Sequence, residues 1–183
     1  GSGGPFVRVS IQNSSGDVIG LGETISNDGD PVTVTVDIQT PEWFTVNSLD
    51  IFSNGPAEDV ITPPGETVED ALEPTLSIPL PAMQLVEVSV GTETHRRHEL
   101  TYEFEMNPSE DAYVVMVISG DDRMNVVVAG QKPFAFTNPF FIDADGSGFD
   151  RRAMLQHLGD HFFVPAHAAF ATAAAALRDA TVG

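Results

Sequence analysis

Oxygen-bearing side chains stand at alternate positions in residues 143–150, which read DADGSGFD after an apolar segment. The first three of them match the first, third and fifth positions of an EF-type calcium loop, and Gly148 matches the sixth. Carboxylate and hydroxyl oxygens on a loop relaxed by glycine are the ligands that calcium prefers. The pattern therefore predicts a calcium site with ligands from Asp143, Asp145, Ser147 and Asp150.

A second interpretation explains the same residues without an ion. The twelfth position of the loop is Met154, where a complete EF-hand carries a bidentate glutamate. Aspartate and serine side chains also accept hydrogen bonds from backbone N–H groups two residues further on. The alternative is therefore an Asx-stabilised turn that caps a helix beginning after Asp150.

Two further groups of side chains have the types that bind metals or anions. His157 and His161 are four residues apart, which is a metal-binding spacing on a helix. Gly159 interrupts that helix, so histidines on the surface or in side-chain packing are the simpler expectation. Paired arginines in residues 95–98 (HRRH) and at 151–152 have the chemistry to bind a carboxylate or phosphate. Because the chain has 27 acidic residues, ion pairs with its own glutamates are the simpler expectation.

No motif for nucleophilic or cofactor chemistry is complete. Residues 119–121 (SGD) lack the GxSxG pattern of a serine nucleophile, and residues 20–22 (GLG) lack the third glycine of a dinucleotide-binding loop. Cysteine is absent, which excludes thiolate nucleophiles, disulfides and Cys-based zinc sites. We therefore predict that this chain is not itself an enzyme.

The elements expected to position these residues are β-strands. Apolar and polar residues alternate over residues 6–11, 32–38 and 99–106, which is the period of a half-buried strand. Residues 49–52 and 85–90 predict two more strands. Several short strands of this kind indicate a mainly antiparallel β-sandwich with an immunoglobulin-like layout, and a jelly roll is the alternative architecture.

Other segments carry more specific expectations. Residues 112–118 are continuously apolar, which predicts a central strand covered on both faces. Residues 126–129 and 134–142 predict edge strands, and residues 92–98 predict a polar hairpin tip. Trp43, the only tryptophan, is expected to anchor the core because it can bury a large area.

The predicted sandwich domain covers residues 5–148 and contains a proline-rich stretch at residues 56–81. Central strands do not tolerate so many prolines, so we expect a long loop or insertion there. Residues 149–183 predict a helical appendage, whose alanine-rich helix at 165–180 needs a packing partner. Residues 1–4 (GSGG) resemble an expression scar.

Charge and hydropathy restrict the classes of partner. The chain has 183 residues and a formal net charge of −19, with 27 acidic residues against 8 basic ones. Such a surface repels phosphate backbones and anionic lipids, so neither nucleic acid nor a membrane is an expected partner. No apolar run approaches the roughly 20 residues that span a bilayer, and no signal peptide is recognisable.

Two segments together resemble a known family. The first is residues 4–7 (GPFV) leading into an early strand, followed by Trp43 and a strand that ends at residues 54–55 (NG). The second is residues 111–120 (DAYVVMVISG) followed by residues 133–146 (PFAFTNPFFIDADG), in which a TNP stretch leads into an aspartate- and glycine-rich turn. This order resembles the β-rich C-terminal accessory region of PHP-type metallohydrolases of the CehA/McbA-like group. The resemblance covers residues 4–150 and is most specific at 111–146. It implies a module that accompanies a separate catalytic domain, whose HxH-type metal motifs have no counterpart here.

Two functions follow as expectations. The first is a non-catalytic accessory domain that packs against the catalytic domain of a longer parent chain, or that forms a homo-oligomer through the 165–180 helix. The second is a calcium-stabilised extracellular binding module for a sugar or protein ligand. Exposed aromatic side chains beside the acidic loop, such as Phe140 or Phe149, would favour the second function.

Overall fold

The structure is a computed structural model, and it describes residues 4–27, 29–53, 74–127 and 129–150. The chain divides into two compact units, Gly1–Phe149 and Asp150–Gly183. Of the second unit only Asp150 is described. The predicted helices, His157, His161 and the second arginine pair therefore lie outside the described residues.

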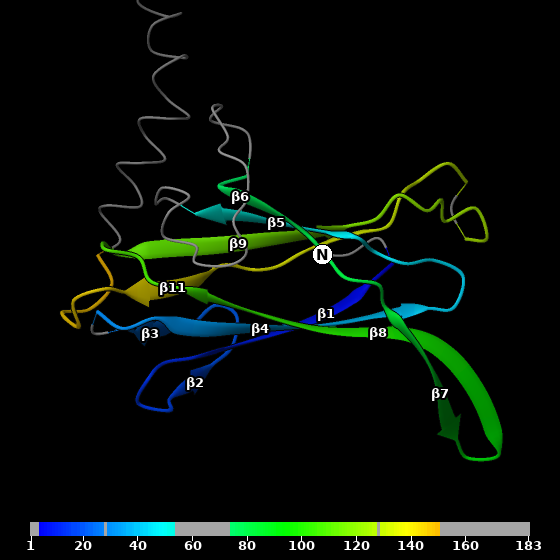
Figure 1. Ribbon diagram of the computed structural model, residues 1–183, viewed down its shortest axis with the longest axis horizontal. Coiled ribbons are helices and arrows are strands. Elements are labelled where there is room, and N and C mark those ends of the chain that lie inside the picture. Colours follow the sequence, from blue (N-terminus) through cyan, green and yellow to red (C-terminus); the bar gives the residue numbers. More distant parts are fainter. Residues whose placement is uncertain (1–3, 28, 54–73, 128, 151–183) are drawn as a thin grey trace, which may run out of the picture. The chain divides into compact units, whose positions relative to one another are not determined.

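Two β-sheets stack to form a sandwich in the first unit (Figure 1). The first sheet has the strand order β2-β1-β4-β8-β7, with bounds Val18–Ile19, Phe6–Gln12, Val32–Pro41, Glu93–Met106 and Gln84–Val90. The second has the order β3-β11-β9-β5-β6, with bounds Thr24–Ser26, Phe140–Asp143, Ala112–Ser119, Ser48–Ser53 and Leu76–Pro79. β10 (Phe134–Phe136) pairs with the last part of β9, beyond the start of β11. The described residues contain no helix.

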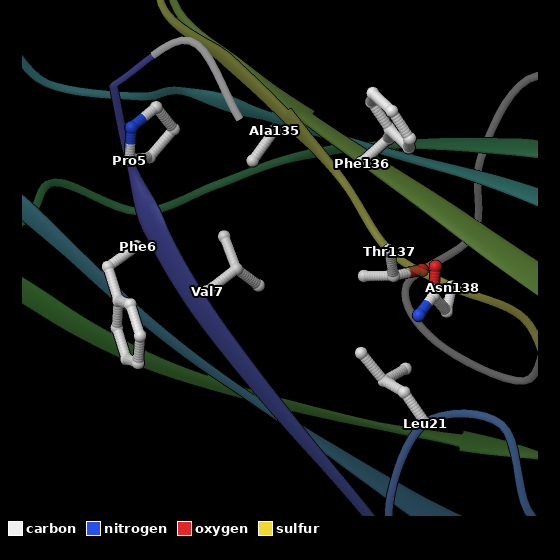
Figure 2. A pocket seen from close by; sticks show the side chains of 8 residues that line it. All are labelled: Pro5, Phe6, Val7, Leu21, Ala135, Phe136, Thr137 and Asn138. Atoms are coloured by element: carbon white, nitrogen blue, oxygen red, sulfur yellow. The ribbon is translucent and has the colours of Figure 1, made fainter. Parts of the chain in front are cut away.

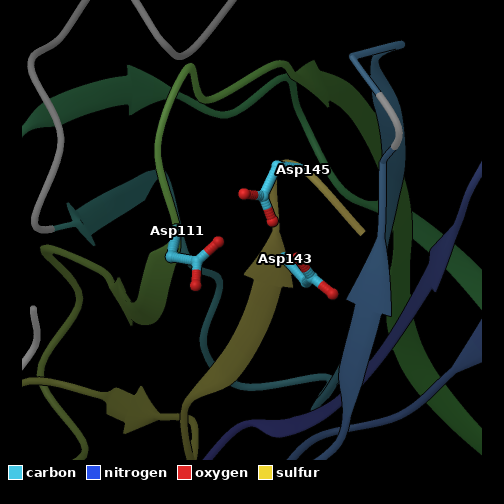
Figure 3. A group of neighbouring side chains, drawn as sticks. All are labelled: Asp111, Asp143 and Asp145. Carbon is cyan, nitrogen blue, oxygen red and sulfur yellow. The ribbon is translucent and has the colours of Figure 1, made fainter. Parts of the chain in front are cut away.

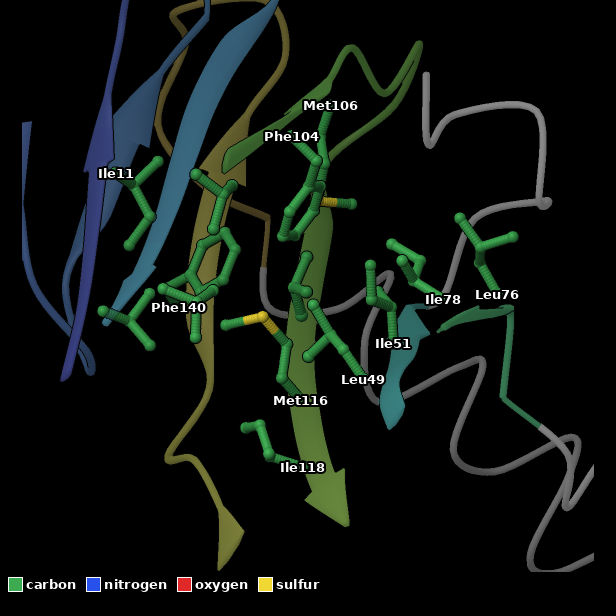
Figure 4. Close-up of a cluster of buried hydrophobic side chains, with 14 of the residues drawn as sticks. Ile11, Leu49, Ile51, Leu76, Ile78, Phe104, Met106, Met116, Ile118 and Phe140 are labelled. Atoms are coloured by element: carbon green, nitrogen blue, oxygen red, sulfur yellow. The ribbon is translucent and has the colours of Figure 1, made fainter. Parts of the chain in front are cut away.

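The core lies between the sheets, where every second side chain of each long strand points inward. On β4 the inward residues are fully buried, and Met116 and Ile118 of β9 face them from the other sheet. Figure 4 shows side chains of both sheets in this apolar layer. Burial of this layer supplies the main stabilising free energy of the sandwich.

Strand pairing is antiparallel except between β3 and β11, which run parallel with Asp143 opposite Ser26. β11 also pairs with β9 in antiparallel register, with Ile142 opposite Ala112. This register brings the end of β11 to the start of β9. Residue 111 precedes Ala112 and residue 143 follows Ile142, so the two come together at one end of the second sheet.

The alternating segments at 6–11, 32–38 and 49–52 form β1, β4 and β5, which confirms these predictions. Residues 85–90 and 99–106 lie within β7 and β8, also as predicted. The predicted hairpin tip at 92–98 is wrong, because β8 already begins at Glu93 and pairs with β7 from there. The turn itself lies at Gly91 and Thr92, and Gly91 has a positive φ of 66°.

Three other local predictions need correction. Residues 126–129 form no strand in their described part, where Val126 and Val127 lie exposed in a turn. Residues 134–142 form two strands, and β11 is not at an edge because β3 pairs with it. β9 is central as predicted, but its outward side chains are only half-buried.

Trp43 is half-buried, whereas its neighbour Phe44 is fully buried, so Phe44 rather than Trp43 anchors this part of the core. The two rings meet edge to face with centroids 4.7 Å apart. In the proline-rich stretch, residues 54–73 lie outside the described residues, but β6 occupies its last part. β6 is an edge strand, where a proline such as Pro79 is tolerated.

Candidate functional site

Three aspartates meet where β11 ends and β9 begins. One carboxylate oxygen each from Asp111, Asp143 and Asp145 lies within 4.8 Å of the other two. Figure 3 shows Asp143 at the tip of β11, with Asp111 before β9 and Asp145 in the following loop. We call these three residues the acidic cluster.

A backbone N–H group holds each carboxylate of the acidic cluster. Ala144 donates to Oδ1 of Asp111 at 3.0 Å, and Gly148 donates to Oδ2 of Asp143 at 2.8 Å. Ser147 donates to Oδ1 of Asp145 at 2.9 Å. All three donors belong to the loop that follows β11. The loop therefore fixes the three carboxylates while one oxygen of each accepts a backbone hydrogen bond.

Burial differs strongly across the acidic cluster. The Asp143 side chain is only 5% exposed, Asp111 is half-buried and Asp145 is exposed. Oδ1 of Asp143 is buried and has no hydrogen-bond partner among the described residues. A buried carboxylate oxygen without a partner is costly, because it has lost its hydration and gained nothing in return. This atom is the feature of the site that most needs an explanation.

Hydrogen bonds from Ser147 determine the direction in which the pKa of Asp145 is shifted. Hydrogen bonds from the hydroxyl and then from the backbone N–H of Ser147 lower the pKa of Asp145 below its ordinary value. The ionised form of Asp145 is thus favoured. Among the described residues, no arginine, lysine or histidine forms an ion pair with Asp143 or Asp145.

The structure brings together two of the four predicted calcium ligands and adds one that sequence reasoning missed. Asp143 and Asp145 belong to the acidic cluster, while Ser147 donates hydrogen bonds to Asp145. Asp150 belongs to the second compact unit. Asp111 was missed because it lies 32 positions before Asp143, and only the pairing of β9 with β11 reveals it. The Asx turn itself is present, since Asp145 accepts from the N–H two residues on, while the helix that it was predicted to cap lies outside the described residues.

The aromatic residues beside this loop are partly covered. Phe140 is fully buried in the core, so it is not one of the exposed aromatic side chains that would favour a binding module. Phe149 is half-buried and packs on Phe141, with ring centroids 4.8 Å apart and planes tilted by 53°. This contact holds the end of the loop against β11.

A second feature is an open groove with apolar and polar lining, between β1 and β10 with the residues that follow it. It encloses about 260 Å³ and is lined by Pro5, Phe6, Val7, Leu21, Ala135, Phe136, Thr137 and Asn138. Figure 2 shows Val7 and Leu21 projecting into the space between these segments. Phe6 and Phe136, at its margins, are 61% and 49% exposed. Exposed aromatic side chains beside a cavity are typical of protein contact surfaces.

Hydrogen bonds hold the backbone on the β10 side of the groove, whereas β1, on the other side, has an edge without a partner strand among the described residues. Thr137 accepts a hydrogen bond from the N–H of Met116 through its hydroxyl and donates its own N–H to the carbonyl of Met116. This pair of bonds ties the break between β10 and β11 to β9. By contrast, β2 pairs with β1 only at Ile11 and Gln12, so Phe6 to Ser10 have β4 as their only partner strand among the described residues.

The other candidate residues have structural partners. Arg96 pairs with Glu42 at 2.8 Å, and Arg97 Nε donates to Glu99 at 2.6 Å, so intramolecular ion pairs occur here as expected. His95 contacts Glu93, while the ring of His98 lies 3.4 Å from the carbonyl of Pro41. These residues lie on β8, at the end of β4 and directly after β4.

Residues 119–122 also serve the fold. Asp121 accepts hydrogen bonds from Lys132 at 2.7 Å and from Asn47 at 2.9 Å. Asp122 accepts the backbone N–H and the hydroxyl of Thr45, at 2.9 and 3.0 Å. These bonds join the turn after β9 to the segment before β5. Neither aspartate contacts a described histidine in these interactions.

No helix among the described residues is long and apolar enough to cross a membrane. In comparisons with known proteins, no family model, no curated protein and no solved structure matched this chain. The resemblance to the accessory region of PHP-type metallohydrolases therefore stays a prediction.

Proposed function

We propose that this chain is a non-catalytic accessory module that docks an extended segment of a partner domain in the groove beside β1. The observation that carries this proposal is the combination of exposed aromatic margins with an edge of β1 that has no partner strand over Phe6 to Ser10 within the described part of the chain. The resemblance to the C-terminal region of PHP-type metallohydrolases is consistent with such a role, because that region accompanies a catalytic domain.

An immunoglobulin-like layout is part of the proposal. The order β1-β4-β8-β7 corresponds to strands A, B, E and D of an immunoglobulin sandwich, and β11-β9-β5 to G, F and C. The parallel pairing of β3 with β11 places an early strand beside the last one. In this arrangement the groove lies between the first strand, β1, and β10 with the residues that follow it.

The groove suits a β-strand better than a compact ligand. A strand laid along Phe6 to Ser10 gains main-chain hydrogen bonds from β1, while alternate side chains enter the groove. Pro5 and Phe6 lie at one end and Asn138 at the other. The −19 net charge of the chain attracts a partner segment with flanking lysines or arginines and disfavours an acidic one.

The experiment uses a panel of synthetic ten-residue peptides that alternate valine with threonine and carry lysines at both ends. We expect them to shift the backbone amide NMR signals of β1 and to bind at least fivefold more tightly than glutamate-flanked copies. Phe6→Ser and Phe136→Ser should weaken binding by removing apolar contact area.

Val126→Ser is the matched control, because Val126 is 74% exposed in a turn that does not line the groove. The groove proposal is contradicted if no peptide of the panel perturbs β1. It is equally contradicted if Val126→Ser reduces binding as much as Phe6→Ser, since that result would indicate non-specific adhesion.

A further inference from the structure

We propose that the acidic cluster of Asp111, Asp143 and Asp145 binds one calcium ion, which joins the end of β11 to the start of β9. This inference goes beyond the docking role, because it uses other residues and stands independently of the groove. It differs from an EF-type loop, in which all ligands come from one continuous segment.

The buried oxygen of Asp143 points to a ligand. Asp143 is a charged side chain with 5% exposure, and its Oδ1 has no hydrogen-bond partner among the described residues. Its carboxylate belongs to a group whose oxygen atoms lie within 4.8 Å of one another. A cation bound by these three carboxylates compensates the negative charge of Asp143, whose Oδ1 has no other partner within the described part of the chain, and so offsets the penalty of burying it.

Repulsion among the carboxylates of the acidic cluster also supports a bound cation. Antiparallel pairing continues up to Ile142 and Ala112, so the next positions, 143 and 111, bring two carboxylates together. Like charges at adjacent positions of a sheet destabilise it, and Asp145 adds a third charge. No described basic side chain pairs with Asp143 or Asp145, so a divalent cation is the simplest source of compensation.

The donor set selects the kind of ion. Carboxylates favour calcium, magnesium or manganese, whereas zinc and copper favour imidazole or thiolate. Oxygen atoms within 4.8 Å of one another are close enough to share one such ion. Calcium binds six to eight oxygens at 2.3–2.6 Å in flexible geometry, whereas magnesium demands a near-ideal octahedron at 2.0–2.1 Å and loses its waters reluctantly. Three carboxylates held at different depths therefore suit calcium better than magnesium.

The backbone anchors make the site preorganised. Each carboxylate keeps a hydrogen bond to a loop N–H, and the carbonyl of Asp143 accepts from the N–H of Asn27 after β3. The ion thus acts on three connected segments: the end of β11, the loop after it and the residue before β9. Because Asp145 is exposed, the outer coordination positions are open to water.

Isothermal titration of the full chain with calcium chloride after EDTA treatment tests the proposal, alongside thermal unfolding. We expect one calcium per chain and a melting temperature that rises by roughly 5–10 °C at a calcium concentration 100-fold above Kd. Magnesium at the same concentration should give a smaller rise. Asp145→Asn and Asp111→Asn should each weaken calcium binding at least tenfold.

Glu105→Gln is the matched control, since it removes one exposed negative charge from β8, outside the cluster. Its calcium affinity should stay within about twofold of that of the parent chain, because general charge attraction is screened by salt. Asp145 is exposed, so its substitution should not prevent folding. The proposal is overturned if the folded chain binds no calcium at millimolar concentration. Equal affinity in Asp145→Asn, Asp111→Asn and Glu105→Gln would overturn it too.

Discussion

The backbone N–H of Ala144 donates a 3.0 Å hydrogen bond to Oδ1 of Asp111, a residue 33 positions earlier in the chain. This bond fastens the loop after β11 to the residue that precedes β9. It also holds Asp111 beside Asp143 at the end of β11 and Asp145 in the loop. The acidic cluster is therefore a product of strand pairing, and the calcium proposal depends on this long-range contact.

Asp143→Asn should have opposite effects with and without calcium. In EDTA we expect the variant to gain about 0.2–1 kcal/mol of unfolding free energy, because like-charge repulsion is relieved while the amide oxygen still accepts from Gly148. In calcium the variant should be less stable than the parent, because a carboxylate ligand is lost. Urea unfolding in both buffers measures the two differences. A loss of stability in EDTA would contradict the repulsion argument.

Thr137→Val should destabilise the fold by about 1–3 kcal/mol, because the buried N–H of Met116 loses its acceptor. Thr137→Ser keeps the hydroxyl and should cost only about 0.8 kcal/mol for the lost methyl group. Chemical denaturation of both variants gives the comparison. If Thr137→Ser lowers the unfolding free energy as much as Thr137→Val does, packing rather than the hydrogen bond explains the role of Thr137.

Gly120→Ala should cost about 1–3 kcal/mol through overpacking. A Cβ atom at Gly120 would overlap the carbonyl oxygen of Thr45 and lie 3.0 Å from Cα of Val46, both of them backbone atoms. At Gly20 an added Cβ meets only the flexible end of Glu23, at 3.7 Å. Gly20→Ala is therefore the control and should change the melting temperature little. Similar melting temperatures for the two variants would show that the backbone at Gly120 adapts.

The ionisation of Asp121 gives a pH-dependent prediction. Its pKa lies below the ordinary value of 3.8 because Lys132 and then Asn47 donate hydrogen bonds to the carboxylate. A carboxyl group with a lowered folded pKa stabilises the protein above its unfolded pKa, and this contribution disappears as pH falls through the folded pKa. We therefore expect a small loss of stability below about pH 3.8. In a carbon NMR titration, Lys132→Met should raise the Asp121 midpoint.

A strand could be predicted where its own residues carry the alternating apolar and polar pattern. Alternation of apolar and polar residues every second position identified β1, β4 and β5, because one face of each strand is buried in the core. The first part of β8 escaped prediction because Glu93 to Arg96 are exposed on both faces and show no alternation. Val126 and Val127 have high β propensity but lie in a turn, where tertiary context overrides that preference.

The candidate site was predictable only in part. Asp143 and Asp145 stand in one loop with glycines, so their spacing is visible in the sequence. Asp111 carries no such local signal, because its role depends on the register of β9 with β11. The groove was not predicted at all, since Val7, Leu21 and Ala135 come from three separate segments.

A crystal structure of the protein grown with 5 mM calcium chloride and without competing chelator tests the central claim most directly. We predict one strong density peak with carboxylate oxygens of Asp111, Asp143 and Asp145 at about 2.3–2.6 Å, and Oδ1 of Asp143 among them. Anomalous scattering would identify the ion as calcium. The claim is contradicted if well-ordered density shows the three carboxylates without an ion and with water or a shared proton at Oδ1 of Asp143.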